Sequence, residues 1–224
     1  AARIEASKVF AKDLMKKYHI PTADYATFDD PSKVMEYIRA KNKYPVVIKA
    51  DGLALGKGVL ICESEEEAAE GVKEIMLDKK FGASGNHVVV EEFLTGPEVS
   101  VLSFTDGKVV KPMVSSMDHK RAGNHDTGLN TGGMGTVAPN PYYTPAVAER
   151  CMKEIFLPTI AAMNAEGCPF KGCLYFGLMI TSDGPKVIEY NCRFGDPETQ
   201  VVLPLLESDL LPVMTACTNG TLAD

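Results

Sequence analysis

The chain has 224 residues, 45% of them hydrophobic and 24% charged, with a formal net charge of −7. These values are typical of a globular protein with a sizeable core. The negative charge argues against a nucleic-acid-binding protein, which needs a basic face to neutralise phosphates. No apolar run approaches the roughly 18 residues of a membrane-spanning helix, and the charged, amphipathic start does not match a signal peptide. We therefore expect neither nucleic acid nor membrane as a partner.

Helices and strands alternate in the first part of the chain. Residues 4–18 have the pattern of an amphipathic helix. A second helix, in "DDPSKVMEYIRAK", is expected to begin at Asp30 as N-cap, with Pro31 in its first turn. "YPVVIKA", "GVLIC" and "HVVVEEFL" predict strands, and "ESEEEAAEGVKEIML" predicts a helix in which Ser64 and Glu67 match a capping box.

Two antiparallel hairpins are predicted further along. "EVSVLSFTDGKVVKPMVSS" turns at Asp106-Gly107, and "CLYFGLMITSDGPKVIEY" turns at Asp183-Gly184. Such hairpins mixed with helices favour an α+β fold over a doubly wound sheet. Residues 22–92 have the pattern of a small lobe of their own.

The segments around these hairpins are less regular. Residues 115–143 form a long loop with little periodicity, which a compact domain seldom keeps without a use. A helix in "TPAVAERCMKEIFLPTIAAMNAEG" is expected to end at Gly167 and to kink or break at Pro158. "NCRFGDPETQ" is a polar loop, and "VVLPLLESDLLPVMTACT" is helical but interrupted by prolines.

The six cysteines indicate a cytoplasmic protein. They form no C-x-x-C pair, and several lie in apolar stretches such as "VLIC" and "GCLYFGLMI". Buried, reduced thiols of this kind are typical of a reducing compartment. With four scattered histidines, a zinc site is not expected.

The stretch "KADGLALGKGVLI" contains a candidate phosphate-binding loop. A Walker A loop needs G-x-x-x-x-G-K-[ST] before a helix, but Gly52 and Gly56 are only four apart, Gly58 replaces the hydroxyl residue, and a strand follows. A dinucleotide-binding fingerprint also requires a helix at this point. A strand–glycine loop–strand hairpin can instead fold over a triphosphate, with Lys49 and Lys57 supplying charge. A flexible turn carrying two solvated lysines is the alternative.

The segment "VIEYNCRFGDPETQ" contains a candidate metal site. Glu189 and Asn191 are two apart on a predicted strand, so they share a face. Carboxylate and amide oxygens suit Mg²⁺, which takes one or two protein ligands besides phosphates and water. Arg193 follows two residues later, where it could hold a phosphate or acyl-phosphate oxygen. A surface salt bridge among these residues is the alternative.

The segment "VVVEEFLTGPEVSV" has the pattern of a hinge between lobes. A strand that ends in acids is followed by a Gly-Pro turn. Main-chain groups of Glu92, Phe93 and Leu94 could bind an adenine edge, and Glu98 could bind a ribose hydroxyl. An ordinary strand end with solvated acids is the alternative.

Taken together, these segments resemble the ATP-grasp superfamily and, within it, the glycinamide ribonucleotide synthetase (phosphoribosylamine–glycine ligase) family. The resemblance covers most of the chain. It rests on "VIKADGLALGKGV", "VVEEFLTGPEVSVLSFTDG", "DHKRAGNHDTGLNTGGMG" and "KVIEYNCRFGDPETQVVLP". It implies an ATP-grasp fold, with a small lobe at 22–92, a larger lobe at 1–21 and 93–224, and nucleotide bound between them.

The resemblance also implies roles for particular residues. ATP would contact Lys8, Lys49, Gly56, Lys57, Gly58, Glu91, Glu92, Phe93, Leu94 and Glu98. The metal ligands would be Glu189 and Asn191, Arg193 would face the transferring phosphoryl group, and Asp196 would contact the substrate amine. The remaining substrate contacts would be Asp118, His119, Lys120, Arg121, Thr131, Gly132, Gly133, Pro197, Glu198 and Thr199.

The implied reaction joins glycine to 5-phosphoribosylamine in de novo purine biosynthesis. ATP and Mg²⁺ are required, with Mn²⁺ as an alternative metal. The glycine carboxylate attacks the γ-phosphorus to give glycyl phosphate and ADP, and the amine then displaces phosphate. Positioning and charge neutralisation carry such chemistry, so no protein nucleophile is needed.

Two departures from the family pattern leave alternatives open. The strand "CLYFGLMI" is uncharged, so metal binding rests on Glu189 and Asn191 alone. The family's N-terminal and C-terminal domains have no counterpart here, and both chain ends have the pattern of cuts through a longer protein. The alternatives are an ATP-binding fragment that is inactive alone, or an ATP-grasp ligase for another carboxylate and amine.

Overall fold

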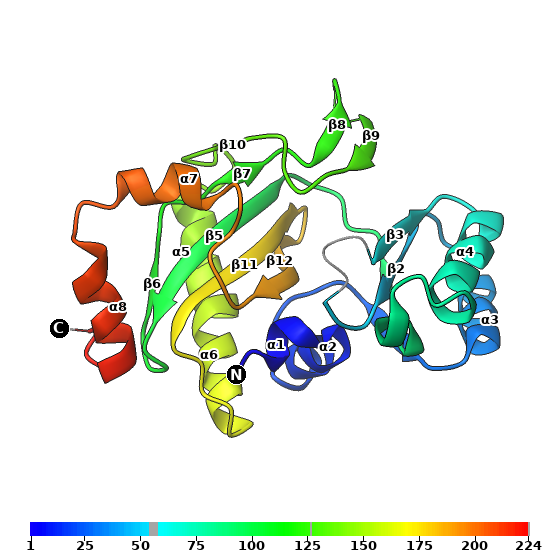
Figure 1. The fold of residues 1–224 in the computed structure, drawn as a ribbon, viewed down its shortest axis with the longest axis horizontal. Helices are drawn as coiled ribbons and strands as arrows, with labels where there is room; N and C mark the ends of the chain where they lie inside the picture. Colours follow the sequence, from blue (N-terminus) through cyan, green and yellow to red (C-terminus); the bar gives the residue numbers. More distant parts are fainter. Residues whose placement is uncertain (54–57, 126, 224) are drawn as a thin grey trace. The chain divides into compact units, whose positions relative to one another are not determined.

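The computed structural model describes residues 1–53, 58–125 and 127–223, and they divide into two compact units (Figure 1). The smaller unit contains Arg3–Asp13 and Thr22–Leu94. The larger contains Ala1–Ala2, Leu14–Pro21 and Thr95–Asp224. The boundary near residue 94 lies two residues beyond the predicted one, and Arg3–Asp13 groups with the smaller unit rather than with 93–224.

The smaller unit is an antiparallel sheet with two helices on one face. Its strand order is β1-β4-β2-β3. These strands are β1 (Tyr25–Phe28), β2 (Val46–Ala50), β3 (Val59–Cys62) and β4 (Val88–Glu92). Side chains alternate across a strand. Val46, Ile48 and Ala50 therefore enter a core with α3 (Pro31–Lys41) and α4 (Glu65–Val72), while Lys49 lies on the opposite face.

Both predicted helix starts of this unit are confirmed. Asp30 caps α3 by accepting a hydrogen bond from the Ser32 amide, and Pro31 occupies the first turn. Ser64 caps α4 by accepting from the Glu67 amide, while the Glu67 carboxylate accepts from the Glu63 amide. A π-helical turn, Lys73–Leu77, continues α4.

The predicted helix over 4–18 is two helices, α1 (Arg3–Ala6) and α2 (Lys8–Lys17). Ser7 separates them because its Oγ accepts a hydrogen bond from the Phe10 amide and so caps α2. Asp51, at the base of the glycine loop, accepts hydrogen bonds from Ser7 Oγ at 3.3 Å and from the Val9 amide at 3.2 Å. These contacts tie Arg3–Asp13 to the smaller unit, which explains the difference from the predicted boundary.

The larger unit is built on a second antiparallel sheet, ordered β12-β11-β5-β6. Both predicted hairpins are confirmed in it. Its strands are β5 (Glu98–Thr105), β6 (Val110–Pro112), β11 (Gly172–Thr181) and β12 (Gly184–Asn191). A helical rod made of α5 (Pro145–Cys151), a π-helical turn (Met152–Phe156) and α6 (Leu157–Ala165) packs on one face, where Phe156 meets Phe176 at 4.3 Å between ring centroids.

Pro158 does not break this rod. The Leu157 amide reaches back to the Met152 carbonyl, so a wider π-helical turn directly precedes the proline. Phe156 and Leu157 both keep helical backbone angles. The helix ends before Gly167, whose φ is +68°.

The predicted loop 115–143 contains four short strands. They are β7 (Met117–Asp118) paired with β10 (Thr136–Val137), and β8 (Arg121–Gly123) paired with β9 (Thr127–Asn130). Strands of only two to four residues are too short to show an alternating pattern. The sequence prediction missed them for this reason.

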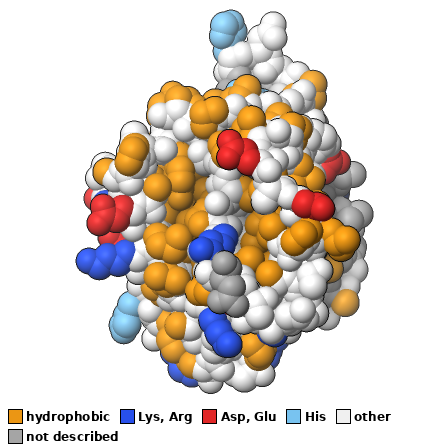
Figure 2. Space-filling model, turned by 90° about the vertical axis from the view of Figure 1, so that its left-hand side faces the viewer, with side chains coloured by type: hydrophobic (Ala, Val, Ile, Leu, Met, Phe, Trp, Pro, Cys, Tyr) orange, Lys and Arg blue, Asp and Glu red, His pale blue; other side chains and the backbone are white. Residues whose placement is uncertain are grey.

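The C-terminal segment contains α7 (Thr199–Val202), a 3₁₀ turn (Leu203–Leu205) and α8 (Leu210–Asn219). Figure 2 looks at the larger unit from the side of α8 and β6 and shows hydrophobic side chains gathered over this face. Leu211 is 72% exposed. Among the described residues no single helix could cross a membrane; Thr199–Leu205 and Leu210–Asn219 meet the criteria of length and apolarity only together, with a 99° bend between them.

Candidate active site

In the smaller unit, the base of the glycine loop is closely packed. Lys8 Nζ donates to the Gly52 carbonyl at 2.7 Å, and the Ala50 amide donates to the Gly58 carbonyl at 2.8 Å. Gly52 has a φ of +109°, and a Cβ there would lie 2.5 Å from Ser84 Oγ. These contacts place Lys8 beside the loop that the sequence assigned to ATP. Gly56 and Lys57 lie outside the described residues.

Lys49 and Glu91 form a buried ion pair next to this loop. Lys49 Nζ lies 3.0 Å from Glu91 Oε1, and the two residues are 6% and 5% exposed. Glu91 has a second lysine partner, which sequence reasoning missed: Lys12 Nζ lies 3.0 Å from Glu91 Oε2. Its spacing from Lys8 on one helix gave a hint, since residues four apart share a face.

The residues after Glu91 differ in their surroundings. Glu92 Oε1 accepts from the Asp24 amide at 3.2 Å, and its Oε2 lies 3.9 Å from Lys43 Nζ. Phe93 is 37% exposed, and Leu94 is half-buried. The Glu92 carboxylate thus contacts Asp24 and Lys43, whereas the Glu91 carboxylate faces Lys49.

In the larger unit, the predicted site residues share one face of the sheet. Ser100 pairs with Gly177 and Gly177 with Glu189, while Tyr175 pairs with Asn191. Residues directly opposite on neighbouring strands point to the same face. A bulge between Gly177 and Leu178 lets β12 keep Glu189 and Asn191 on that face.

Gly177 makes room for Glu189. A Cβ at position 177 would lie 3.0 Å from Glu189 Cγ. The glycine therefore leaves a gap in the face that the Glu189 side chain crosses. The glycine in the uncharged strand "CLYFGLMI" is the sequence signal for this gap.

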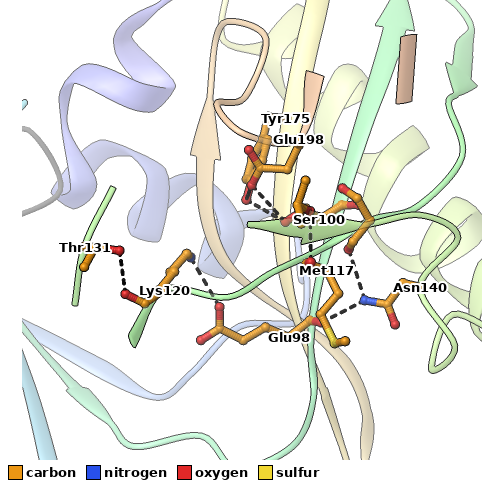
Figure 3. Close-up of polar contacts among 10 residues, drawn as sticks. Glu98, Ser100, Met117, Lys120, Thr131, Asn140, Tyr175 and Glu198 are labelled. Atoms are coloured by element: carbon orange, nitrogen blue, oxygen red, sulfur yellow. Dashed lines mark hydrogen bonds and ion pairs between the residues drawn. The ribbon is translucent and has the colours of Figure 1, made fainter. Parts of the chain in front are cut away.

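Tyr175, Ser100 and Glu198 form a hydroxyl–carboxylate network in the larger unit (Figure 3). The Tyr175 hydroxyl donates to Glu198 Oε1 at 3.0 Å and lies 2.8 Å from Ser100 Oγ, which also donates to Glu198 at 3.3 Å. Glu198 is only 3% exposed. Burial raises the pKa of the Tyr175 hydroxyl, so it stays protonated as a donor. Glu198 therefore points inward, and sequence reasoning missed Tyr175 and Ser100 because their contacts are distant in the chain.

Lys120 lies among acidic side chains. Its Nζ is 3.3 Å from Glu98 Oε2. Burial alone would lower the pKa of the Lys120 ammonium, but the nearby carboxylates of Glu98 and Glu189 outweigh burial and raise it. The structure thus brings together Lys120, Glu98 and Glu189, which the sequence assigned to substrate, ribose and metal.

Asp118 has one carboxylate oxygen without a hydrogen-bond partner among the described residues. This atom, Oδ1, is buried. Burial first, and then the Glu198 carboxylate, raise the pKa of Asp118 to about 6. A Cβ at Gly133 would lie 2.4 Å from Pro197 Cδ and 3.1 Å from Asp118 Oδ1, so the two predicted substrate segments meet here.

The rest of the substrate loop is held by side-chain and backbone hydrogen bonds within the loop itself. Thr131 Oγ1 donates to the Lys120 carbonyl at 2.8 Å and accepts from the Gly133 amide at 3.1 Å. The His119 amide donates to the Gly135 carbonyl, and Arg121 Nη1 donates to the Gly128 carbonyl at 2.7 Å. Thr131 and Gly132 are exposed, so their outer surfaces are available to a ligand.

The loop after β12 presents two side chains outward. Asp196 is exposed and its Oδ1 accepts from Gln200 Nε2 at 2.6 Å. Arg193 is exposed too, donating to the Phe194 carbonyl at 3.0 Å and to Asn191 Oδ1 at 3.4 Å. Thr199 Oγ1 donates to the Gly195 carbonyl and so helps to shape the turn.

The described residues hold no group of three or more His, Cys, Asp or Glu side chains that could bind a metal. Glu189 and Asn191 nevertheless have the right donor chemistry for Mg²⁺ that is shared with phosphates. Asn191 Oδ1 accepts from Arg193 at 3.4 Å, and an amide oxygen has a second lone pair that can bind a metal. The pair fits a metal that arrives with a nucleotide better than one bound by protein alone.

A protein-family model described as "Phosphoribosylglycinamide synthetase, ATP-grasp (A) domain" matches residues 6–199. The curated phosphoribosylamine–glycine ligase of Pasteurella multocida is 51% identical over 99% of this chain, which covers 52% of that protein. A bifunctional purine biosynthetic protein PUR2,5 of Pichia angusta is 54% identical over 96% of the chain, which covers 27% of it. The crystal structure of a phosphoribosylamine–glycine ligase of Thermotoga maritima superposes with a TM-score of 0.90 at 38% identity, covering 98% of this chain and 55% of that one.

Proposed function

Because the chain belongs to the phosphoribosylglycinamide synthetase ATP-grasp (A) domain family, we propose that it serves an ATP-dependent ligase joining glycine to 5-phosphoribosylamine. Its fold is the α+β ATP-grasp fold. The chain spans about half the length of the bacterial ligases it matches. The proposal therefore includes the substrates, partners and flanking domains of the whole protein. It also includes a cytoplasmic location, where the six free thiols would stay reduced.

One observation carries the proposal most directly. Lys49 is a buried cation at the base of a glycine-rich hairpin, in a cluster that holds more positive than negative charge. Burying excess charge is costly unless an opposite charge can approach it. A nucleotide phosphate is the anion that such a hairpin would cover.

The residues of each unit have defined parts in the proposed reaction. Lys8, Lys49 and Lys57 bind the ATP phosphates. A glycine carboxylate oxygen attacks the γ-phosphorus, the bond to the β–γ bridging oxygen breaks, and ADP leaves. Arg193 compensates charge on the transferring phosphoryl group. Mg²⁺ held by Glu189 and Asn191 would neutralise phosphate charge.

The second step forms the amide. The amine of 5-phosphoribosylamine attacks the carbonyl carbon of glycyl phosphate, the bond from that carbon to the phosphate oxygen breaks, and the proton lost from the nitrogen passes to water. Asp196, which is exposed, would hold the amine, as the family resemblance implies. Asp118, Lys120, Arg121 and the 131–133 turn would shape the site. Glu98 would contact the ribose.

The proposal is tested by thermal unfolding with and without MgATP. Nucleotide at a hundred times its dissociation constant should stabilise the protein by about 2.7 kcal/mol. For a chain of this size the shift is on the order of 5–10 °C. Lys49→Ala should lose most of the shift, whereas Lys153→Ala, on the helical rod of the larger unit, should keep it. No shift with the wild type would contradict ATP binding by this chain.

A second candidate is favoured by the coverage of the relatives. The chain covers 52% of the bacterial ligase, so it could bind ATP yet need the rest of the parent protein for turnover. ADP release that depends on both glycine and 5-phosphoribosylamine separates these candidates. Release with another carboxylate and amine instead would indicate a different ligase specificity.

A further inference from the structure

Lys12 is a buried lysine that has no role in the proposed reaction. It lies on α2 and is 2% exposed. Its Nζ is 3.0 Å from Glu91 Oε2, 2.8 Å from Thr22 Oγ1 and 3.4 Å from the Ala23 carbonyl. An ammonium has three hydrogen-bond donors, so these acceptors fix its position.

Glu91 is shared between two ammonium groups. One carboxylate oxygen faces Lys12 and the other faces Lys49, each at 3.0 Å. Glu91 and Lys49 lie on the sheet face opposite the α3–α4 core, and Lys12 of α2 contacts Glu91 on that face. The three buried charges sum to +1.

We infer that Lys12 is a positioning residue for ATP: by holding and neutralising Glu91, it leaves Lys49 with a net positive charge to present to a phosphate. This inference rests on the proposed function, because it takes Lys49 as a phosphate ligand. Without Lys12, Glu91 would neutralise Lys49, and the cluster would carry no net charge. A buried neutral pair attracts a phosphate far less than a buried cation does.

The same cluster makes ATP binding sensitive to pH. Burial, and after it the nearby Lys49 charge, lower the pKa of Lys12, while Glu91 and Glu92 oppose the change; the net result is a pKa of about 8. Tyr25 on β1 also faces Lys12: its ring centroid lies 5.5 Å from Nζ, and its hydroxyl donates to Asp13. As pH rises through about 8, Lys12 loses its proton, and the cluster loses its net charge. ATP should then bind more weakly.

The decisive experiment is calorimetry of MgATP binding at pH 7 with charge-matched variants. Lys12→Met should raise the dissociation constant about tenfold or more, which is roughly 1.4 kcal/mol. Lys12→Met combined with Glu91→Gln restores the net charge of +1 and should return the constant to within about threefold of wild type. A purely structural role for Lys12 predicts that the double variant binds as weakly as the single one or worse. Lys17→Met, on the exposed end of the same helix, is the control and should bind like wild type.

The pH dependence supplies an independent readout. Wild-type affinity should fall between pH 7 and pH 9, and Lys12→Met should show no such fall. Lys12→Arg keeps its charge throughout, so it should bind like wild type at pH 7 and not weaken at pH 9. This variant carries the test if Lys12→Met does not fold.

The outcomes separate this inference from the proposed function. If wild type does not bind MgATP at all, the proposed function fails and the inference fails with it. If wild type binds but Lys12→Met binds equally well, or the double variant shows no recovery, only the inference is overturned.

Discussion

Tyr175 is the residue on which the interior of the larger unit's site depends most. Its hydroxyl contacts both Glu198 and Ser100, and all three groups are buried. Removing the hydroxyl leaves a buried carboxylate with one donor fewer. We expect Tyr175→Phe to lower the free energy of unfolding by about 1–3 kcal/mol in urea titrations. Tyr142→Phe, at a 51% exposed position, should change it little, and an equal loss in both variants would contradict the role of the network.

Asp118 should make stability depend on pH. Its pKa is raised to about 6 in the folded protein from an unfolded value of 3.8, so folding favours its protonated form. This contribution to stability is fully present below about pH 4 and is lost as pH rises through 6. Asp118→Asn cannot ionise, so its stability relative to wild type should increase between pH 4 and pH 7. Unfolding titrations at the two pH values measure this change, and an unchanged difference would be inconsistent with a raised pKa.

At the scale of elements, the start of β5 depends on a glycine. Gly96 has a φ of +147°, and a Cβ there would lie 2.1 Å from the Ile180 carbonyl oxygen on β11. Backbone cannot move aside as a side chain can. We expect Gly96→Ala to destabilise the protein by about 3 kcal/mol or more, from overpacking and backbone strain together. Gly167 has a φ of +68°, but a Cβ there would meet nothing within 4 Å. Gly167→Ala should therefore lower the free energy of unfolding by only about 1 kcal/mol. Similar losses at both sites would exclude the close approach as the cause.

The elements that could be predicted from sequence are those fixed by local contacts. The Asp30 and Ser64 caps and the turns at Asp106 and Asp183 depend on neighbours within a few residues. The short strands of 115–143 could not be predicted, because two residues show no period. The inward orientation of Glu198 depends on Tyr175, which is 23 residues away in the chain. The burial of Lys12 on α2 depends on Glu91, which lies on β4. No local pattern encodes such partners, although residue types at the site were predictable from the motifs.

At the scale of the whole molecule, the face in Figure 2 has a consequence for association. Contiguous exposed apolar surface promotes contact between copies. We expect Leu211→Glu to reduce the apparent mass in light scattering at high protein concentration. Its free energy of unfolding should stay within about 0.5 kcal/mol of wild type, because the side chain is 72% exposed. Leu77→Glu, at a 63% exposed position in the smaller unit, is the matched control, and an equal effect there would argue against a role for this particular face.

The contact between Gly133 and Pro197 also limits how this chain can be recombined with its relatives. The two segments meet so closely that position 133 has no room for a side chain. Consider a chimera that receives the 115–143 segment from a relative but keeps its own 195–199 turn. Its two contacting segments come from different parents and were never selected to fit each other. Functional crossovers in a shuffled library should therefore inherit both segments from the same parent.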